Sequence, residues 1–169
     1  MSFIRLKKRV TKSKESHYAY LVNNKWHKNL PKQKVALYLG RYHKLDSKQI
    51  NIALPKHKNI LVSLLKKELL LHNFNQKNSS SFIHPEGFIV DLKKNKVLNK
   101  HTKNQVCLGL NQGFLCSYTL KNLLKFKPKL NSKKKTKQTS KSLIRVLLEA
   151  GIRPDKDQFL KAFSKLKII

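Results

Sequence analysis

The chain is 169 residues long and carries 38 Lys and Arg against 8 Asp and Glu, so its formal net charge is +30 and its isoelectric point is near 10.4. Charge of one sign at this density destabilises a compact fold unless a partner neutralises it, and nucleic acid is the abundant partner of matching charge density. Apolar residues make up 40% of the chain, which excludes a wholly disordered tail, and the apolar runs are too short to span a bilayer.

Residues 1–45 are predicted to form a small antiparallel β-meander. Aromatic and aliphatic strand formers fill three segments, polar connectors separate them, and Gly40 is expected to end the third strand. The expected strands cover residues 3–9, 17–22 and 34–39. This part of the chain holds 12 basic residues and one acid, Glu15, so one face of the meander should be strongly positive.

A helix is predicted over residues 57–74. Its apolar residues, among them Leu64, Leu65 and Leu69, form a wide surface with lysines on the opposite side. We therefore expect this helix to pack against the meander. A polar loop should follow over residues 75–81.

The middle of the chain is predicted to mix short strands with one short helix, which makes the fold class α+β. Apolar pattern and turn residues place these elements over residues 87–92, 97–98, 105–110 and 118–126. We expect residues 1–126 to form one basic nucleic-acid-binding domain.

A lysine-rich linker is predicted over residues 127–139. From Lys121 to Lys141 there are nine lysines, no acid and no apolar periodicity that would fold the segment, so it should be extended. A C-terminal helical hairpin is expected over residues 140–169, with a serine N-cap at its first residue and Gly151 after its first helix. This hairpin is the least basic part of the chain, which suits docking on protein.

Catalytic residues are not indicated by the sequence. Metal-dependent nucleases need converging carboxylates to hold divalent ions, and Glu86 and Asp91 have the pattern of two surface acids that flank a strand. Cys107 and Cys116 lack metal-ligand spacing and are expected to be buried thiols, and nothing orients a nucleophile pair of Cys107 with His101. We expect no enzyme activity, no metal and no cofactor.

Two groups of residues are candidate RNA contacts. The first lies on the meander edge, where Trp26 in a basic polar connector is either a stacking platform for an unpaired base or a lid over the sheet edge. The second is the lysine run of the linker, for which the alternative is a solvated segment. The candidate residues are Arg5, Lys7, Lys8, Arg9, Lys12, Lys14, Lys25, Trp26, Lys28, Lys32, Lys34, Arg41, Lys133, Lys134, Lys135 and Lys137.

Residues 17–41 carry a pattern of tyrosines, aliphatic residues and a closing Gly-Arg pair. The pattern is Tyr18-x-Tyr20-Leu21-Val22, then Pro31-Lys-Gln-Lys-Val35-x-Leu37-x-Leu39-Gly40-Arg41. It resembles the N-terminal β-meander segment of insertion-sequence transposases. The resemblance implies a shared nucleic-acid-binding module. It implies no catalytic residue, because the chain lacks the acids for the transposase carboxylate triad.

These observations favour a non-enzymatic RNA-binding protein, a ribosomal or ribosome-associated component held by contacts to the phosphate backbone. The predominance of lysine over arginine speaks against bidentate base readout. The alternative is a DNA-binding protein derived from a mobile element. The expected partners are rRNA or DNA, with other ribosomal proteins on the C-terminal helices and no membrane. Because the N-terminus turns basic at once and lacks the apolar core of a signal peptide, we expect a cytoplasmic location.

Overall fold

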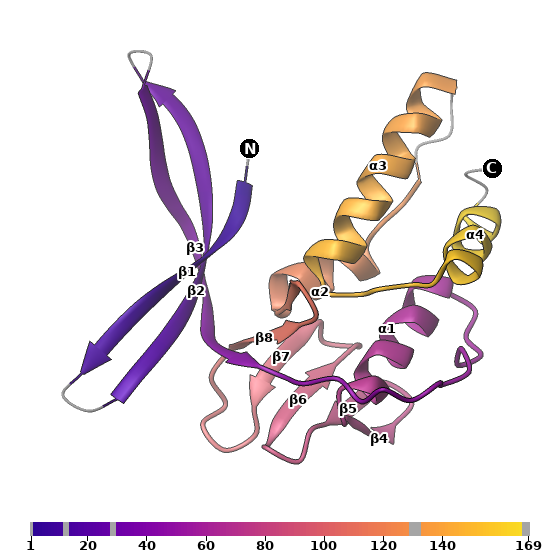
Figure 1. Ribbon diagram of the computed structural model, residues 1–169, viewed down its shortest axis with the longest axis horizontal. Helices are drawn as coiled ribbons and strands as arrows, with labels where there is room; N and C mark the ends of the chain where they lie inside the picture. Colours follow the sequence, from indigo (N-terminus) through magenta and orange to yellow (C-terminus); the bar gives the residue numbers. More distant parts are fainter. Residues whose placement is uncertain (1, 12–13, 28–29, 129–132, 167–169) are drawn as a thin grey trace.

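The computed structural model describes residues 2–11, 14–27, 30–128 and 133–166. Within these ranges the chain forms two β-sheets and four helices (Figure 1), which confirms the α+β class. The strands are β1 (Ser2–Thr11), β2 (Lys14–His27), β3 (Leu30–Lys44), β4 (Asn75–Asn78), β5 (Ser81–Ile83), β6 (Phe88–Asp91), β7 (Lys96–Asn99), β8 (Val106–Leu110) and β9 (Gly113–Leu115). The helices are α1 (Ile60–Leu71), α2 (Ser117–Leu124), α3 (Lys133–Glu149) and α4 (Lys156–Lys165).

The first sheet has the strand order β1-β2-β3-β8-β9. Its first three strands are the predicted meander, and β3 then pairs in parallel with β8 through residues 41–44. β1 pairs with residues 14–23 of β2, whereas β3 pairs with residues 18–27, so each end of β2 belongs to a two-stranded ribbon. Figure 1 shows both ribbons projecting from the body of the protein.

Gly40 lies within β3 and does not end it, so the predicted strand end is wrong. The strand continues to Lys44, where it is already paired with β8. Gly40 has a φ of +116°, and a Cβ atom there would lie 2.3 Å from the carbonyl oxygen of Gln105. Only glycine combines this backbone angle with so close an approach, so β3 can pass beside the start of β8 without a break.

The helix α1 packs in the main core and not against the meander, which corrects the predicted packing. Leu64, Leu65 and Leu69 share one core cluster with Phe82 and Val90 of the second sheet and with residues of the other three helices. Between Ile60 and Leu69, every residue except Lys67 is buried. A helix with so wide a buried surface needs neighbours on several sides, and a single sheet face does not supply them.

The second sheet has the order β4-β5-β6-β7 and is antiparallel throughout. β4 occupies residues 75–78, a turn follows at 79–80 and β5 begins at Ser81, so the loop predicted over the whole of residues 75–81 is wrong. All four residues of β4 are polar and exposed. Such a strand has no apolar alternation to reveal it, and it is held by backbone pairing with β5. The strands and the helix predicted for the rest of the middle region are confirmed by β6, β7, β8 and α2.

The meander rests on β8, β9 and the start of α2. Ala19 and Leu39 are buried with Cys107 and Cys116 in a second, smaller apolar cluster. Both cysteines are free and buried, as predicted. At the other edge of the meander, Arg145 of α3 donates a hydrogen bond from Nη2 to the carbonyl oxygen of Ser2 at 3.0 Å. The meander therefore has a fixed position relative to the helices.

The helix α3 begins at Lys133 and not at Ser140, so the last part of the predicted linker is helical. Residues 129–132 of that linker lie outside the described residues. Lysine and glutamine are good helix formers, and exposed turns of a helix need no apolar face. The apolar positions begin further along, where Leu143 and Leu147 enter the main core.

A glycine closes α3 as predicted. Gly151 has a φ of +76°, and its N–H donates to the carbonyl oxygen of Leu148 at 3.0 Å. The N–H of Ile152 donates to the carbonyl oxygen of Leu147 at 2.9 Å, which completes a Schellman motif. The chain then turns into α4, whose N-cap Asp155 accepts a hydrogen bond from the backbone N–H of Gln158.

Candidate nucleic-acid interface

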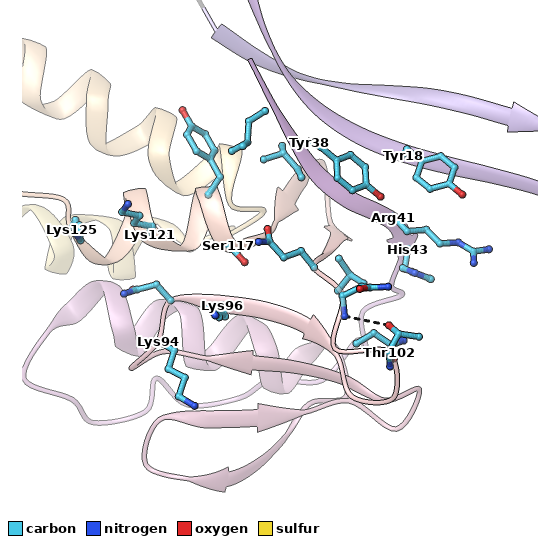
Figure 2. Close-up of a pocket in the computed structure, with 18 residues that line it drawn as sticks. Tyr18, Tyr38, Arg41, His43, Lys94, Lys96, Thr102, Ser117, Lys121 and Lys125 are labelled. Carbon is cyan, nitrogen blue, oxygen red and sulfur yellow. Dashed lines mark hydrogen bonds between the residues drawn. The ribbon is translucent and has the colours of Figure 1, made fainter. Parts of the chain in front are cut away.

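A hollow of 960 Å³ lies between the meander, the second sheet and α2 (Figure 2). It is lined by Tyr18 and by residues from segments 37–43, 94–106 and 117–125. One wall is thus the edge of β3, the second is the β6–β7 turn together with the β7–β8 connection, and the third is α2. We call this hollow the basic groove.

The charge of the basic groove has one sign. Of its 18 lining residues, five are Lys or Arg and none is Asp or Glu. The ion pairs found in the described part of the chain all involve other residues, so none of these five cations is in an ion pair with a carboxylate there. Cations that converge on one hollow raise the local positive potential and attract phosphate. The five are Arg41, Lys94, Lys96, Lys121 and Lys125.

The β3 wall combines aromatic rings with a guanidinium group. Tyr38 lies 5.3 Å from Tyr20 and 6.4 Å from Tyr18, measured between ring centroids, and Tyr38 is 49% exposed. Arg41 is the cross-strand partner of Tyr18, and its Nη2 donates to Ser16 Oγ at 3.1 Å. Burial, together with the neighbouring tyrosines, raises the pKa of Tyr38, so its ring is neutral at pH 7. A neutral exposed ring next to a fixed cation can stack on a base while the cation binds phosphate.

His43 adds no charge to this wall at neutral pH. Burial, and then the positive charge of Arg41, lowers the pKa of His43 below 6.5. Its ring packs on Phe88 at 4.7 Å between centroids. The positive charge of the groove at pH 7 therefore comes from its lysines and Arg41.

The lysines of the other two walls are placed by local backbone structure. Asp91 Oδ1 accepts a hydrogen bond from the backbone N–H of Lys94 at 2.8 Å, which fixes the β6–β7 turn. The N–H of Val97 donates to Ser117 Oγ at 3.1 Å and joins β7 to the first residue of α2. Lys121 and Lys125 follow along that helix four residues apart, so both lie on one side of it (Figure 2).

The sequence-predicted residues of the meander are spread over its exposed surface rather than gathered in one site. Arg5 donates to Gln33 Oε1 at 2.7 Å, and Lys7 Nζ lies 5.3 Å above the ring of Tyr20. Lys8 pairs with Glu15 at 2.6 Å, and hydrogen bonding from Lys8 lowers the pKa of that carboxyl group. Exposed lysines and an arginine line both ribbons: Arg9, Lys14, Lys25, Lys32 and Lys34.

Other predicted contacts are partly or wholly outside the described residues. Trp26 lies in β2 opposite Pro31, so the connector predicted for it is wrong, and its side chain is not among those described. Lys12 and Lys28 lie outside the described residues. Lys137 is exposed on α3, and the backbone of Lys133, Lys134 and Lys135 forms the first turn of that helix. Of all the predicted contacts, Arg41 lines the basic groove.

Four lysines and a tyrosine of the basic groove were missed by the sequence reasoning. Lys94 and Lys96 lie between the predicted strands at residues 87–92 and 97–98, and Lys121 and Lys125 belong to the lysine-rich stretch that begins at Lys121. The four-residue spacing of Lys121 and Lys125 could have indicated that these two lysines lie together, because residues four apart on a helix share one face. Tyr38 sits in a strand pattern that fits a core residue equally well. Nothing in the sequence shows that three distant segments meet at one hollow.

The acids once considered for a metal site do not converge. Glu86 lies before β6 and Asp91 ends that strand, so they stand at opposite ends of it. Within the described ranges no group of three or more His, Cys, Asp or Glu side chains could hold a metal ion. Cys107 is fully buried, whereas His101 is exposed in the β7–β8 connection. The described side chains therefore form neither a carboxylate metal site at Glu86 and Asp91 nor a nucleophile pair of Cys107 and His101.

Comparison of the chain with protein-family models, with curated proteins and with solved structures finds no match. Among the described helices, none has the length and apolar character needed to cross a membrane. The function must therefore be argued from the basic groove and the charged surface around it.

Proposed function

We propose that this protein is a non-enzymatic RNA-binding protein, a ribosomal or ribosome-associated component held through the RNA backbone. The observation that carries the proposal is the acid-free basic groove, in which five cations meet without a carboxylate partner among the described residues. Phosphate is the group whose charge would neutralise such a set of cations. Proteins embedded in folded RNA use contacts of this kind to fix their position.

RNA is favoured over duplex DNA by the shape of the site. Folded RNA exposes loops, bulges and ends whose bases are unstacked and accessible to aromatic side chains. The basic groove offers tyrosines beside cations, whereas a duplex that lay across its rim would meet the cations and leave the rings unused. A site with both kinds of group therefore suits structured RNA better.

The test is a binding measurement with the full chain and a structured RNA over a range of salt concentrations. A variant with Lys94, Lys96, Lys121 and Lys125 changed to Gln should lose affinity, and the slope of log K against log salt should become shallower by about 0.7 for each lost phosphate contact. A matched control removes four exposed lysines elsewhere: Lys58, Lys77, Lys156 and Lys161. Equal losses in the two variants, or no binding of RNA by the unchanged protein, would refute the proposal.

A second candidate is DNA binding, and the two ribbons of the meander favour it. The major groove of DNA admits a two-stranded β-ribbon, and the β2–β3 ribbon carries exposed Lys25, Lys32 and Lys34. This is also the region that resembles the transposase segment. If DNA is the partner, Lys25, Lys32 and Lys34 changed together to Gln should weaken duplex DNA binding more than the groove variant does.

A further inference from the structure

We propose that the basic groove binds a short single-stranded segment of RNA, with a base stacked on Tyr38 and adjacent phosphates on the lysines of α2 and of the β6–β7 turn. This inference rests on the proposed RNA-binding function and goes further by naming the form of the RNA and the residue that stacks. It assigns the single strand to the basic groove and not to the two ribbons or to α3.

The size of the hollow limits what can enter it. At 960 Å³ it has the volume of a large small-molecule site. That volume gives room for a few nucleotides of one strand and not for a whole turn of a double helix. A nucleic-acid segment that enters the groove is therefore expected to be unpaired there.

Tyr38 has the properties of a stacking platform. About half of its surface is exposed, although it is a large aromatic residue in the middle of a strand. Tyr20 and Tyr18 support it from the neighbouring strand, with centroids 5.3 Å and 6.4 Å away. A ring that is fixed on one side and open on the other can accept a base with little loss of side-chain entropy.

The edge of β3 in the groove adds hydrogen-bonding groups. Within the described pairing, β3 meets β8 only from Arg41 onward, so the backbone edge at Leu37 and Leu39 on that side has no partner strand. Leu37, which is 47% exposed, lines the same hollow as the exposed side chains of Asn104 and Gln105, whereas Leu39 is buried. Amides and backbone groups of this kind pair with the edges of unstacked bases.

The α2 wall is suited to consecutive phosphates. Lys125, the C-cap residue of α2, donates its backbone N–H to the carbonyl oxygen of Lys121 at 3.0 Å, so the two lysines lie one helical turn apart, with Cβ atoms roughly 5–6 Å apart. Lys94 of the β6–β7 turn and Lys96 at the start of β7 line another wall of the same groove (Figure 2). One strand passing between these walls would meet cations on both sides while its bases reach the β3 edge.

A protein strand is the competing occupant of the same edge. Val35 and Leu37 are 44% and 47% exposed, and an extended peptide could add to β3 beside them. The five cations without a carboxylate partner favour a polyanion, because a neutral or basic peptide would leave their charge uncompensated in a narrower space. An RNA strand satisfies both the edge and the cations.

The test uses the full-length protein, a labelled short oligouridine and an RNA hairpin that is fully paired in its stem. Tyr38→Leu should weaken oligouridine binding roughly 5- to 100-fold, which is the usual cost of losing one base–aromatic stack. Tyr38→Phe keeps the ring and should bind like the unchanged protein. Neither variant should change binding to the hairpin stem, and thermal unfolding of both variants shows whether they are folded.

The outcomes separate this inference from the function on which it rests. If hairpin and oligouridine bind equally and Tyr38→Leu affects neither, the protein binds RNA but the groove does not take a single strand. If no RNA binds at all, the proposed function fails as well.

Discussion

Glu68 carries a carboxylate inside the protein, with 4% of its surface exposed. Its Oε1 accepts from Asn111 Nδ2 at 2.7 Å, and its Oε2 accepts from the backbone N–H of Arg153 at 3.2 Å. The same amide of Asn111 also donates to the carbonyl oxygen of Gly151 at 2.7 Å. One acid therefore joins α1, the β8–β9 turn and the connection between α3 and α4.

Replacing Glu68 by Ala should lower the free energy of unfolding by about 3 kcal/mol, because two partly buried hydrogen bonds to a buried carboxylate are lost. Urea denaturation followed by circular dichroism measures the change. Glu15→Ala is the control, since Glu15 pairs with Lys8 at an exposed site and its loss should leave the midpoint nearly unchanged. A Glu68→Ala variant as stable as the control would show that this network contributes little.

His84 makes stability depend on pH. Burial lowers the pKa of this histidine below 6.5, and its Nδ1 accepts the backbone N–H of Glu86 at 3.2 Å, which requires the unprotonated nitrogen. As the pH falls below 6.5, the unfolded chain takes up a proton that the folded protein resists. The free energy of unfolding should therefore decrease until the pH falls below the folded pKa, and His43 acts in the same direction.

A His84→Gln variant should show a weaker loss of stability between pH 7 and pH 5 than the unchanged protein. Thermal midpoints over that range measure it. His101→Gln is a suitable control, because His101 is exposed in the β7–β8 connection. If the two variants have the same pH profile, the acid sensitivity of the protein arises at other groups.

At the scale of elements, the parallel pairing of β3 with β8 joins the meander to the rest of the protein. Gly40→Ala places a Cβ atom 2.3 Å from a backbone oxygen at a φ of +116° and should lower the free energy of unfolding by about 3 kcal/mol. Gly87→Ala is the matched control, because its φ is +84° but the nearest atom is 3.0 Å away on the flexible side chain of His101. It should cost about 1 kcal/mol.

Denaturation of the two glycine variants tests this difference, and hydrogen exchange locates it. In Gly40→Ala the amides of residues 41–44 should lose protection first, because their parallel pairing with β8 begins beside the substituted residue. Equal costs for the two substitutions would mean that the approach of β3 to Gln105 relaxes easily.

Elements with a clear apolar period were predicted from the sequence, and the others were not. The meander and β6 have partial alternation, β8 is a short continuous apolar run and α4 has helical spacing, and all of them are present. β4 was not predicted because all of its residues are polar and exposed, so only its backbone pairing with β5 defines it as a strand. The partner of α1 was predicted wrongly because a wide apolar surface shows that a helix is buried but not which neighbours bury it.

The candidate site was less predictable than the fold for a related reason. The excess of basic residues identifies a class of partner. Every lysine contributes equally to that excess, so the net charge does not show which lysines form the site. Arg41 was predicted as a contact because it lies in the basic meander. Lys121 and Lys125 belong to the site only because the fold brings α2 close to β3. Charge patterns along a chain do not contain that distance, so the groove became visible only in the folded molecule.

For the molecule as a whole, the net charge of +30 should make salt act in opposite directions on the free protein and on its RNA complex. In the free protein, lysines repel one another, and raising the salt shortens the Debye length from about 30 Å at 0.01 M to about 8 Å at 0.15 M. The thermal midpoint of the free protein should therefore rise with salt.

With RNA bound, the same addition of salt weakens phosphate contacts because counterion release no longer favours binding. A ligand that binds the folded state stabilises it in proportion to the logarithm of its concentration over Kd, so the midpoint of the complex should fall as Kd increases. The two melting curves should then approach each other with increasing salt. If the free protein melts at the same temperature at all salt concentrations, its charges are already compensated within the fold, and the need for a polyanionic partner disappears.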